Sequence, residues 1–347
     1  MKNNKNLFYK ILKNGGLFLI LIAITFYFIF KSLDINKVIK TISQINIFYI
    51  IPAIVCMCVY IFCEASNTKR NLIALGYNPS IFRCINYSVN GFFFSSITPS
   101  ASGGQPMQAY QMCKDDIKIS HATLVLLIEL IFFQVVTIMF SLIGFFTQQS
   151  LLLRSIGSIK YLLVLGLILN IIALLFLLSA IFSYSAIRKV FDFVIKLIES
   201  LGYNKVKKIR DKVYSIINEY EECSLYITRN KTIILKTFLT TCIQIFAIHS
   251  IPYWVYRSFG FSGYSIFTFV GVQAVLFIAV CALPLPGAVG VSESGFLMLF
   301  KLLFPIRVLS EAMLISRGIS FYLFLFLSGI LLIILKIQNI KVKLTNE

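Results

Sequence analysis

The sequence predicts an all-α fold, that of a polytopic helical membrane protein with an inverted-topology repeat and two re-entrant broken-helix segments. Of its 347 residues, 58% are hydrophobic and only 13% are charged, whereas a soluble domain carries about 25% charged residues. Several uninterrupted apolar stretches are long enough to cross about 30 Å of hydrocarbon, which takes roughly 20 residues. Two further apolar segments, residues 86–112 and 264–295, are interrupted by proline and glycine. The short alternating segments of a transmembrane barrel are absent from the sequence.

Residues 1–47 are expected to form the first transmembrane helix and an interfacial helix. Residues 15–30 are an apolar run, and the four lysines that precede it without any acid place the N-terminus in the cytoplasm. No small-x-small cleavage site follows, so the run is interpreted as an uncleaved helix rather than a signal peptide. Residues 33–45 then carry apolar side chains at helical spacing among polar ones, which indicates a helix lying at the outer interface.

Five more spans follow, at residues 48–66, 121–147, 161–184, 232–256 and 308–335. Basic residues flank the segment 86–112 on both sides, so it is expected to enter and leave from the cytoplasmic side. For the C-terminus to lie in the cytoplasm as well, the segment 264–295 has to enter and leave from the outer side.

Residues 48–147 and 232–347 are therefore interpreted as two halves of opposite orientation, the pattern of an inverted-topology repeat whose broken helices line a substrate path. Residues 148–231 connect the halves through one span and a polar insertion at 188–231. Two apolar stripes in this insertion predict a pair of amphipathic helices on the cytoplasmic face, in contact with anionic lipid. The same stripes also fit a lid or a docking face.

The first broken segment contains the stretch NGFFFSSITPSASGGQPMQAY, which begins at Asn90. Pro99 and Pro106 each remove a backbone donor, and the pair Gly103 and Gly104 adds conformations that a helix cannot use. A helix that enters here must break, and in hydrocarbon each freed backbone group needs a partner. Nearby hydroxyl groups, packed helices or a water-filled cavity are the possible partners.

Ionisable residues within apolar spans are costly and are therefore functional candidates. Glu129 lies in the middle of a span, Glu293 follows the second break, and Arg317 lies within the last span. Glu64 is near the end of its span, where it could simply reach the interface. The alternative to a substrate role is a structural ion pair, either between Glu293 and Arg317 or between Glu129 and Arg317.

The two breaks offer a second chemistry. Helix N-termini released at Gly103 and Gly104, and between Gly287 and Gly290, would point free N–H groups and positive dipole ends inward. A phosphate is the natural ligand for such a site. The alternative is that these glycines only permit close helix packing.

Several other function classes are not supported. The net charge of +18 is explained by basic residues in cytoplasmic loops rather than by nucleic-acid binding. The eight cysteines include no CxxC pair, and the two histidines lie far apart, so no metal site is predicted. No hydrolase elbow and no Walker or dinucleotide-binding motif is present, so no catalytic residue and no cofactor is predicted.

The motifs NGFFFSSITPSASGGQP and PLPGAVGVSESG, in this order and spacing, resemble the lysylphosphatidylglycerol synthase transmembrane-region family, the flippase half of the multiple peptide resistance factor. The resemblance spans roughly residues 10–337 and departs from the family at Gln108, where relatives often carry a basic residue. It implies the following motif residues: Asn90, Thr98, Pro99, Gly103, Gly104, Gln105, Pro106, Pro284, Pro286, Gly287, Gly290 and Glu293. The candidate substrate-binding set takes these motif residues except Pro106 and adds Ser100, Ser102, Glu129 and Arg317.

The resemblance implies a lipid translocase in a bacterial plasma membrane that handles aminoacylated phosphatidylglycerol, with lysyl-phosphatidylglycerol or phosphatidylglycerol as its partner. The chain ends about ten residues after the last span, so we expect any aminoacyl transfer to be done by a separate aminoacyltransferase. One alternative is a phosphatidylglycerol lysyltransferase that docks tRNA on the basic insertion 188–231. Another is a carrier of a different phospholipid or of a polyprenyl phosphate. No oligomeric state is predicted.

Overall fold

The computed structural model describes residues 45–152, 159–182, 214–215, 218–225, 229–281, 286–332 and 334. The predicted first transmembrane helix, all but the last residue of the interfacial helix at 33–45 and most of the insertion 188–231 lie outside the described residues. Pro284 and the tail after residue 334 also lie outside them.

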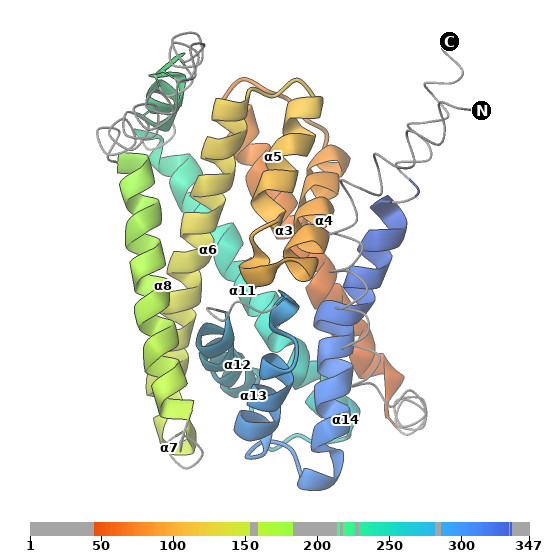
Figure 1. The fold of residues 1–347 in the computed structure, drawn as a ribbon. Coiled ribbons are helices and arrows are strands. Elements are labelled where there is room, and N and C mark those ends of the chain that lie inside the picture. Colours follow the sequence, from red (N-terminus) through yellow and green to blue (C-terminus); the bar gives the residue numbers. More distant parts are fainter. Residues whose placement is uncertain are drawn as a thin grey trace, which may run out of the picture.

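The described residues form helices joined by short loops (Figure 1). The α-helices are α3 (Ile50–Ala74), α4 (Ile81–Ile97), α5 (Gly104–Lys114), α6 (Ile119–Thr147), α7 (Gln149–Leu152), α8 (Ile159–Phe182), α11 (Lys231–Ser258), α12 (Ile266–Val280), α13 (Val291–Phe300) and α14 (Ile306–Arg317). The shorter elements are η1 (Ile47–Tyr49), η2 (Pro99–Ala101), η3 (Pro286–Ala288) and the π-helical η4 (Gly318–Tyr322).

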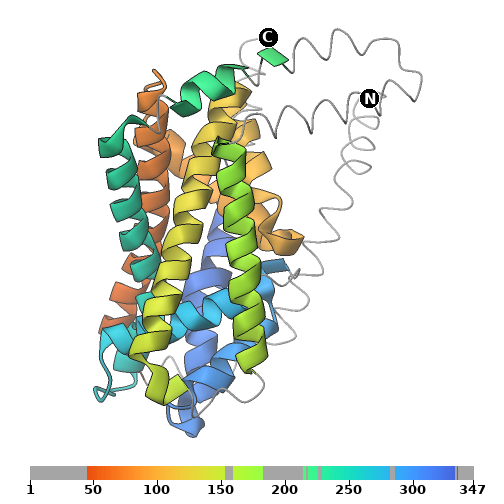
Figure 2. The same cartoon turned by 90° about the vertical axis from the view of Figure 1, so that its left-hand side faces the viewer.

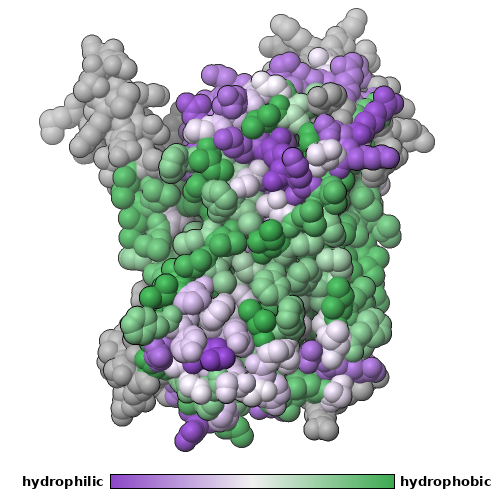
Figure 3. All heavy atoms as spheres, turned by 180° about the vertical axis from the view of Figure 1, so that it is seen from behind, coloured by the Kyte–Doolittle hydropathy of each residue, from purple (hydrophilic) through white to green (hydrophobic). Residues whose placement is uncertain are grey.

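Four helical segments in the described part are long and apolar enough to cross a membrane: Ile47–Ala74, Ile119–Thr147, Lys231–Ser258 and Ile306–Leu332. Figure 3 shows a hydrophobic band across the middle of one face of the molecule, with polar residues gathered at the two ends. α6 and α8 run side by side along the height of the bundle (Figures 1 and 2). This arrangement confirms the prediction of a polytopic helical membrane protein.

Two helical hairpins fill the space between the long helices. α4 and α5 descend from one end of the bundle, whereas α12 and α13 rise from the other (Figure 1). The turns of the two hairpins, η2 and η3, contact each other near mid-height. Both predicted helix breaks are therefore present, and they meet inside the bundle. The inverted repeat as a whole stays a prediction.

Each hairpin begins with a serine cap. The Ser80 hydroxyl accepts the backbone N–H of Arg83 at 3.3 Å at the start of α4, and the Ser265 hydroxyl accepts that of Thr268 at 3.3 Å at the start of α12. A capping hydroxyl satisfies one of the four backbone donors that a helix leaves free at its N-terminus. Both helices thus start at polar residues at the two ends of the bundle.

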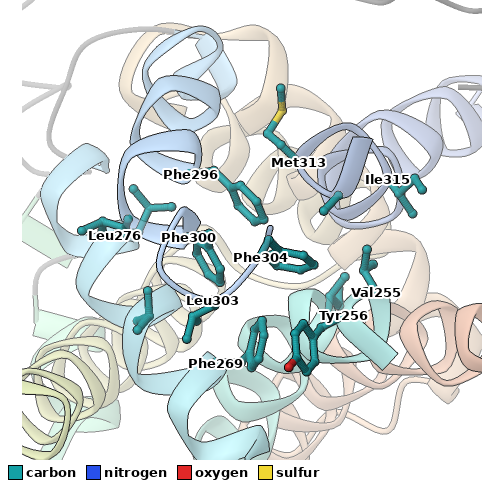
Figure 4. Packing of buried hydrophobic residues seen from close by; sticks show 14 of the residues in the cluster. Val255, Tyr256, Phe269, Leu276, Phe296, Phe300, Leu303, Phe304, Met313 and Ile315 are labelled. Carbon is teal, nitrogen blue, oxygen red and sulfur yellow. The ribbon is translucent and has the colours of Figure 1, made fainter. Parts of the chain in front are cut away.

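An aromatic cluster anchors the second hairpin to the bundle (Figure 4). The rings of Phe296 and Phe300 on α13 stack with centroids 4.1 Å apart, and Phe269 of α12 lies 4.9 Å from Tyr256 of α11. Phe304, beyond α13, meets Phe269 edge to face at 5.7 Å. Aromatic pairs of this kind contribute about 0.5–1.5 kcal/mol each beyond their buried area. These aromatic contacts therefore hold the second hairpin in the bundle at the end of the hairpin opposite its turn.

The last span differs from the uniform helix expected over 308–335. Its first part is α14, which ends at Arg317, and a π-helical turn from Gly318 to Tyr322 follows before the helix continues. Single π-helical turns inside α-helices occur mostly at functional sites. Here the turn lies directly after the partly buried Arg317.

Candidate functional site

A cavity of about 390 Å³ lies where the two hairpins meet. The first hairpin contributes Gly91, Phe92, Ser95, Ser96, Ser100, Ala101, Gln105 and Gln108 to its lining. The second hairpin contributes Gln273, Leu276, Phe277, Val280, Cys281, Gly287, Ala288, Ser292 and Phe296. The polar or titratable side chains from the long helices are Tyr60, Glu64, Asn67, Glu129, Gln244, His249, Ser316, Arg317 and Ser320. The walls thus combine apolar surface with a limited set of polar groups, as ligand pockets do.

The turn of the first hairpin is held by Thr98. Its hydroxyl donates to the carbonyl of Phe94 at 2.6 Å and accepts the backbone N–H of Gly103 at 2.9 Å. Two residues of the turn, Ser100 and Ala101, have φ values of 52° and 55°. Such values are uncommon for residues with a side chain, and residues held in this way cluster at functional sites.

The two helices of the first hairpin pack closely through glycines. A Cβ atom at Gly91 would lie 1.9 Å from Nε2 of Gln108, and one at Gly104 would lie 1.9 Å from the hydroxyl oxygen of Ser95. Gln108 passes over Gly91 and donates from Nε2 to Oε1 of Glu64 at 2.8 Å. The absence of a side chain at Gly91 therefore lets the side-chain amide of Gln108 on α5 reach the carboxylate of Glu64 on α3.

Two carboxylates, Glu64 of α3 and Glu129 of α6, line the same cavity. Neither makes an ion pair with any residue that the structure describes. Oε1 of Glu129 is buried and has no hydrogen-bond partner among these residues. Inside a membrane such unpaired acids mark substrate or ion paths.

The turn of the second hairpin is held by a charged network. Nε of Arg317 donates to Oε1 of Glu293 at 2.9 Å, and Nη2 donates to the carbonyl of Gly287 at 3.0 Å. Glu293 also accepts the hydroxyl of Tyr322 at 2.7 Å and the backbone N–H of Gly290 at 2.5 Å. Glu293 thus caps the N-terminus of α13 and pairs with Arg317. Of the two structural pairs considered from the sequence, the structure contains the one between Glu293 and Arg317.

This network changes the expectation of a phosphate site at each released helix N-terminus. The N-terminus of α13 already holds the Glu293 carboxylate, which complements the positive end of the helix dipole. At the other break, the N–H of Gly103 is taken by Thr98. Nη1 of Arg317, in contrast, makes no hydrogen bond within the described part of the chain. It is the donor that an anionic ligand in the cavity could reach.

The predicted site residues divide into two groups around the cavity. Five of them line it: Ser100, Gln105, Glu129, Gly287 and Arg317. The remaining described ones belong to the two hairpins but are not among the lining residues: Asn90, Thr98, Pro99, Ser102, Gly103, Gly104, Pro286, Gly290 and Glu293. Among these, Asn90 donates to the carbonyl of Asn86 at 2.7 Å within α4.

Sequence reasoning missed Glu64 as a cavity residue. A signal was present, because Glu64, Asn67, Thr68 and Asn71 recur three or four residues apart and so share one face of α3. The last three are buried. A polar stripe on an otherwise apolar span indicates a face turned toward the protein interior, not toward lipid.

Sequence reasoning also missed the neutral polar groups of the cavity. His249, 2% exposed, has no hydrogen-bond partner for either ring nitrogen among the described residues, and its ring lies 5.5 Å from that of Phe277. Oε1 of Gln273 and the hydroxyl of Ser316 likewise lack a partner there. Buried polar groups are normally hydrogen-bonded, so these groups are suited to a ligand or to water.

The described residues contain no group of three or more His, Cys, Asp or Glu side chains that could hold a metal ion. The chemistry available in the cavity is hydrogen bonding from neutral groups and charge interaction with two acids and one guanidinium group.

Comparison with known proteins gives a family match over nearly the whole chain. The family model for the lysylphosphatidylglycerol synthase TM region matches residues 16–328. A UPF0104 membrane protein of Archaeoglobus fulgidus is 22% identical over 318 residues, which cover 90% of this chain and 94% of that protein. UPF0104 membrane protein PH1989 of Pyrococcus horikoshii is 24% identical over 310 residues, covering 86% of this chain and 90% of that protein. No solved structure matches the chain.

Proposed function

Since the chain belongs to the lysylphosphatidylglycerol synthase transmembrane-region family, we propose that it is a lipid translocase for aminoacylated phosphatidylglycerol or a related phospholipid. The observation that carries the proposal is the cavity between two hairpins that enter the bundle from opposite ends, because it contains two carboxylates without an ion-pair partner in the described part. The head of lysyl-phosphatidylglycerol carries two ammonium groups and one phosphate, and both kinds of charge find a counterpart in this cavity.

Glu64 and Glu129 together receive an ammonium group of the head. Charge-assisted hydrogen bonds are roughly twice as strong as neutral ones, and they are worth more in a cavity of low dielectric constant. Nη1 of Arg317, together with Ser100 and Gln105, hydrogen-bonds the phosphate and the glycerol hydroxyl. Glu293 is already engaged by Arg317, so the cationic end of the head is assigned to the other two acids.

The acyl chains stay in the bilayer while the head crosses through the cavity. The volume of about 390 Å³ is within the range of 300–1,000 Å³ of pockets that hold small molecules. The cavity opens alternately toward each end as one hairpin moves against the other, as in transporters with broken helices at the midplane. In a bacterium the protein would act in the plasma membrane.

The charge of the cavity separates this proposal from a carrier of another anionic lipid. A head whose only charge is a phosphate would face two carboxylates and a guanidinium group that is already paired with Glu293. Like charges close together in a poorly hydrated site repel strongly. An aminoacylated head therefore fits better than a polyprenyl phosphate.

Flipping of fluorescent lysyl-phosphatidylglycerol in proteoliposomes tests the proposal. The wild-type protein is expected to move the lipid well above the rate in empty vesicles, and Glu129→Gln to lose about tenfold of the added rate, the effect of one lost charge-assisted hydrogen bond. Glu222→Gln, at an exposed position outside the cavity, is the matched control and keeps the wild-type rate. A wild-type rate equal to that of empty vesicles would defeat the proposal.

A further inference from the structure

We propose that Glu64 and Glu129 form a proton–ammonium exchange site, in which the pair keeps one proton while the cavity is empty and releases it when an ammonium group binds. The inference rests on the proposed function and concerns what drives it. Its basis is geometric: two acids from different helices line one cavity, and the described residues supply neither with an ion-pair partner.

Among the residues that the structure describes, no free cation lies near the two acids to neutralise both. The titratable or charged side chains lining the cavity are Tyr60, Glu64, Glu129, His249, Cys281 and Arg317. Arg317 is bound to Glu293 and to the carbonyl of Gly287. Outside the lining, Arg70 and Cys84 act electrostatically on Glu129, but the Arg70 guanidinium donates to Asn67 at 2.7 Å and to Thr240 at 3.1 Å.

Two carboxylates that share a poorly hydrated site cannot both ionise at low cost, so the pair retains a proton and titrates as a unit. The negative charge of Glu64 acts electrostatically on Glu129. Gln108 donates a hydrogen bond to Glu64 at 2.8 Å and so favours its charged form. Thr68 and Asn71 also act on Glu129, but its Oε1 has no partner in the described part of the chain, so Glu129 is the acid that carries the proton.

The exchange is balanced. An ammonium group enters with its own proton, the O–H bond of the Glu129 carboxyl group breaks, and that proton leaves to water. The result is one ammonium group between two carboxylates, and no other reactant is needed. Because binding and proton release are linked, the lipid head and the proton move in opposite directions across the membrane.

Proton release on binding tests the site without any transport. The protein in weakly buffered detergent at about pH 6, where both lysyl amines are protonated, is titrated with lysyl-phosphatidylglycerol while a pH indicator is read. We expect about one proton released per lipid bound, and none with phosphatidylglycerol, which has no amine. In Glu64→Gln and in Glu129→Gln the remaining acid has no second carboxylate beside it and so no longer has to retain a proton. Proton release on lipid binding is therefore expected to be lost in both variants. Glu222→Gln releases as much as the wild type. Binding by the wild type without release, or a release in the two cavity variants as large as that of the wild type, would overturn the proposal.

A second measurement uses proteoliposomes with a tenfold proton gradient. With acid on the side to which the lipid is delivered, net flipping of lysyl-phosphatidylglycerol is expected to rise by up to about tenfold for one-to-one exchange. Flipping that ignores the gradient would overturn the exchange and leave the translocase intact. Proton release in detergent without any flipping in vesicles would overturn the translocase and support the exchange site.

Discussion

Nε of Arg317 lies 2.9 Å from Oε1 of Glu293 and joins α14 to the start of α13. The side chain of Arg317 is 18% exposed and that of Glu293 is 10% exposed, so the pair is largely buried. Glu293 also accepts a hydrogen bond from the backbone N–H of Gly290, and Arg317 donates one to the backbone carbonyl of Gly287. The ion pair therefore holds the backbone on both sides of the second break.

Arg317→Gln and Glu293→Gln are each expected to lower the free energy of unfolding in detergent by about 3–5 kcal/mol, because one buried charge is left without its partner. The double variant should lose less than the sum of the two, since it leaves neither charge behind. Arg307→Gln, at an exposed position of α14, is the control and should keep the wild-type stability. Thermal unfolding curves measure all four; strictly additive losses would contradict the pairing.

The crossing of α6 and α12 depends on two glycines. A Cβ atom at Gly144 would lie 2.5 Å from the carbonyl oxygen of Gly271, which is backbone and cannot turn aside. Gly144→Ala is therefore expected to force the helices apart and to cost about 1–3 kcal/mol. Gly318→Ala adds a methyl group that meets nothing within 4 Å and should leave the melting temperature unchanged or raise it slightly. Equal effects of the two variants would show that the close crossing is absent.

The Gln108–Glu64 hydrogen bond gives a prediction for binding. Gln108→Leu removes the donor to Glu64, and Gly91→Ala places a methyl group where the Gln108 side chain now lies. Both are expected to lower the affinity for lysyl-phosphatidylglycerol by about tenfold, which corresponds to the loss of one hydrogen bond to a charged group. The control is Gln149→Leu, at an exposed position of α7. Binding titrations in detergent measure this, and wild-type affinity in both variants would contradict the role of Gln108.

The helical residues 218–225 dock on α6 through Glu219, and this contact predicts a pH dependence. Lys118 donates a hydrogen bond to Glu219, which holds the pKa of Glu219 below its ordinary value, and Ser120 adds a second donor at 2.8 Å. A lowered folded-state pKa means that the stabilisation is present above the unfolded pKa, about 4.3, and is lost as the pH falls through the folded-state value.

Hydrogen exchange of residues 218–225, compared between the wild type and Glu219→Gln at the same pH, tests this dependence. At pH 7 the variant should exchange up to about fivefold faster, as expected for a partly exposed pair. At a pH well below 4 the two should exchange alike. A difference that persists at low pH would contradict the assignment, and Glu222→Gln serves as the control at pH 7.

The family and the two helix breaks could be predicted from the sequence because both breaks combine residues that a helix in lipid cannot tolerate unaided. Pro99, Gly103 and Gly104 in one break and Pro286 and Gly287 in the other are local signals, and they need no knowledge of the neighbours. The four described membrane-spanning segments follow from the length of the apolar runs alone.

The partners of the charged residues could not be predicted in the same way. Glu293 and Arg317 are 24 residues apart, and Glu64 and Gln108 are 44 apart. The pairing of acids with donors depends on how each helix is rotated about its axis and how the helices cross. The length of an apolar run does not determine that rotation. The place of Glu64 near the end of its span is compatible with the interface, although the buried Asn67 and Asn71 on the same helical face indicate the interior.

The central claim is that the two hairpins enter from opposite faces of the membrane and meet within it. Asn78, in the loop before α4, and Ser262, in the loop before α12, are both exposed and lie at opposite ends of the bundle. In a variant whose eight cysteines are replaced, Asn78→Cys and Ser262→Cys are each labelled with a membrane-impermeant thiol reagent from one side at a time. The account predicts that Asn78→Cys reacts only from the cytoplasmic side and Ser262→Cys only from the outer side. Labelling of both from the same side would contradict it.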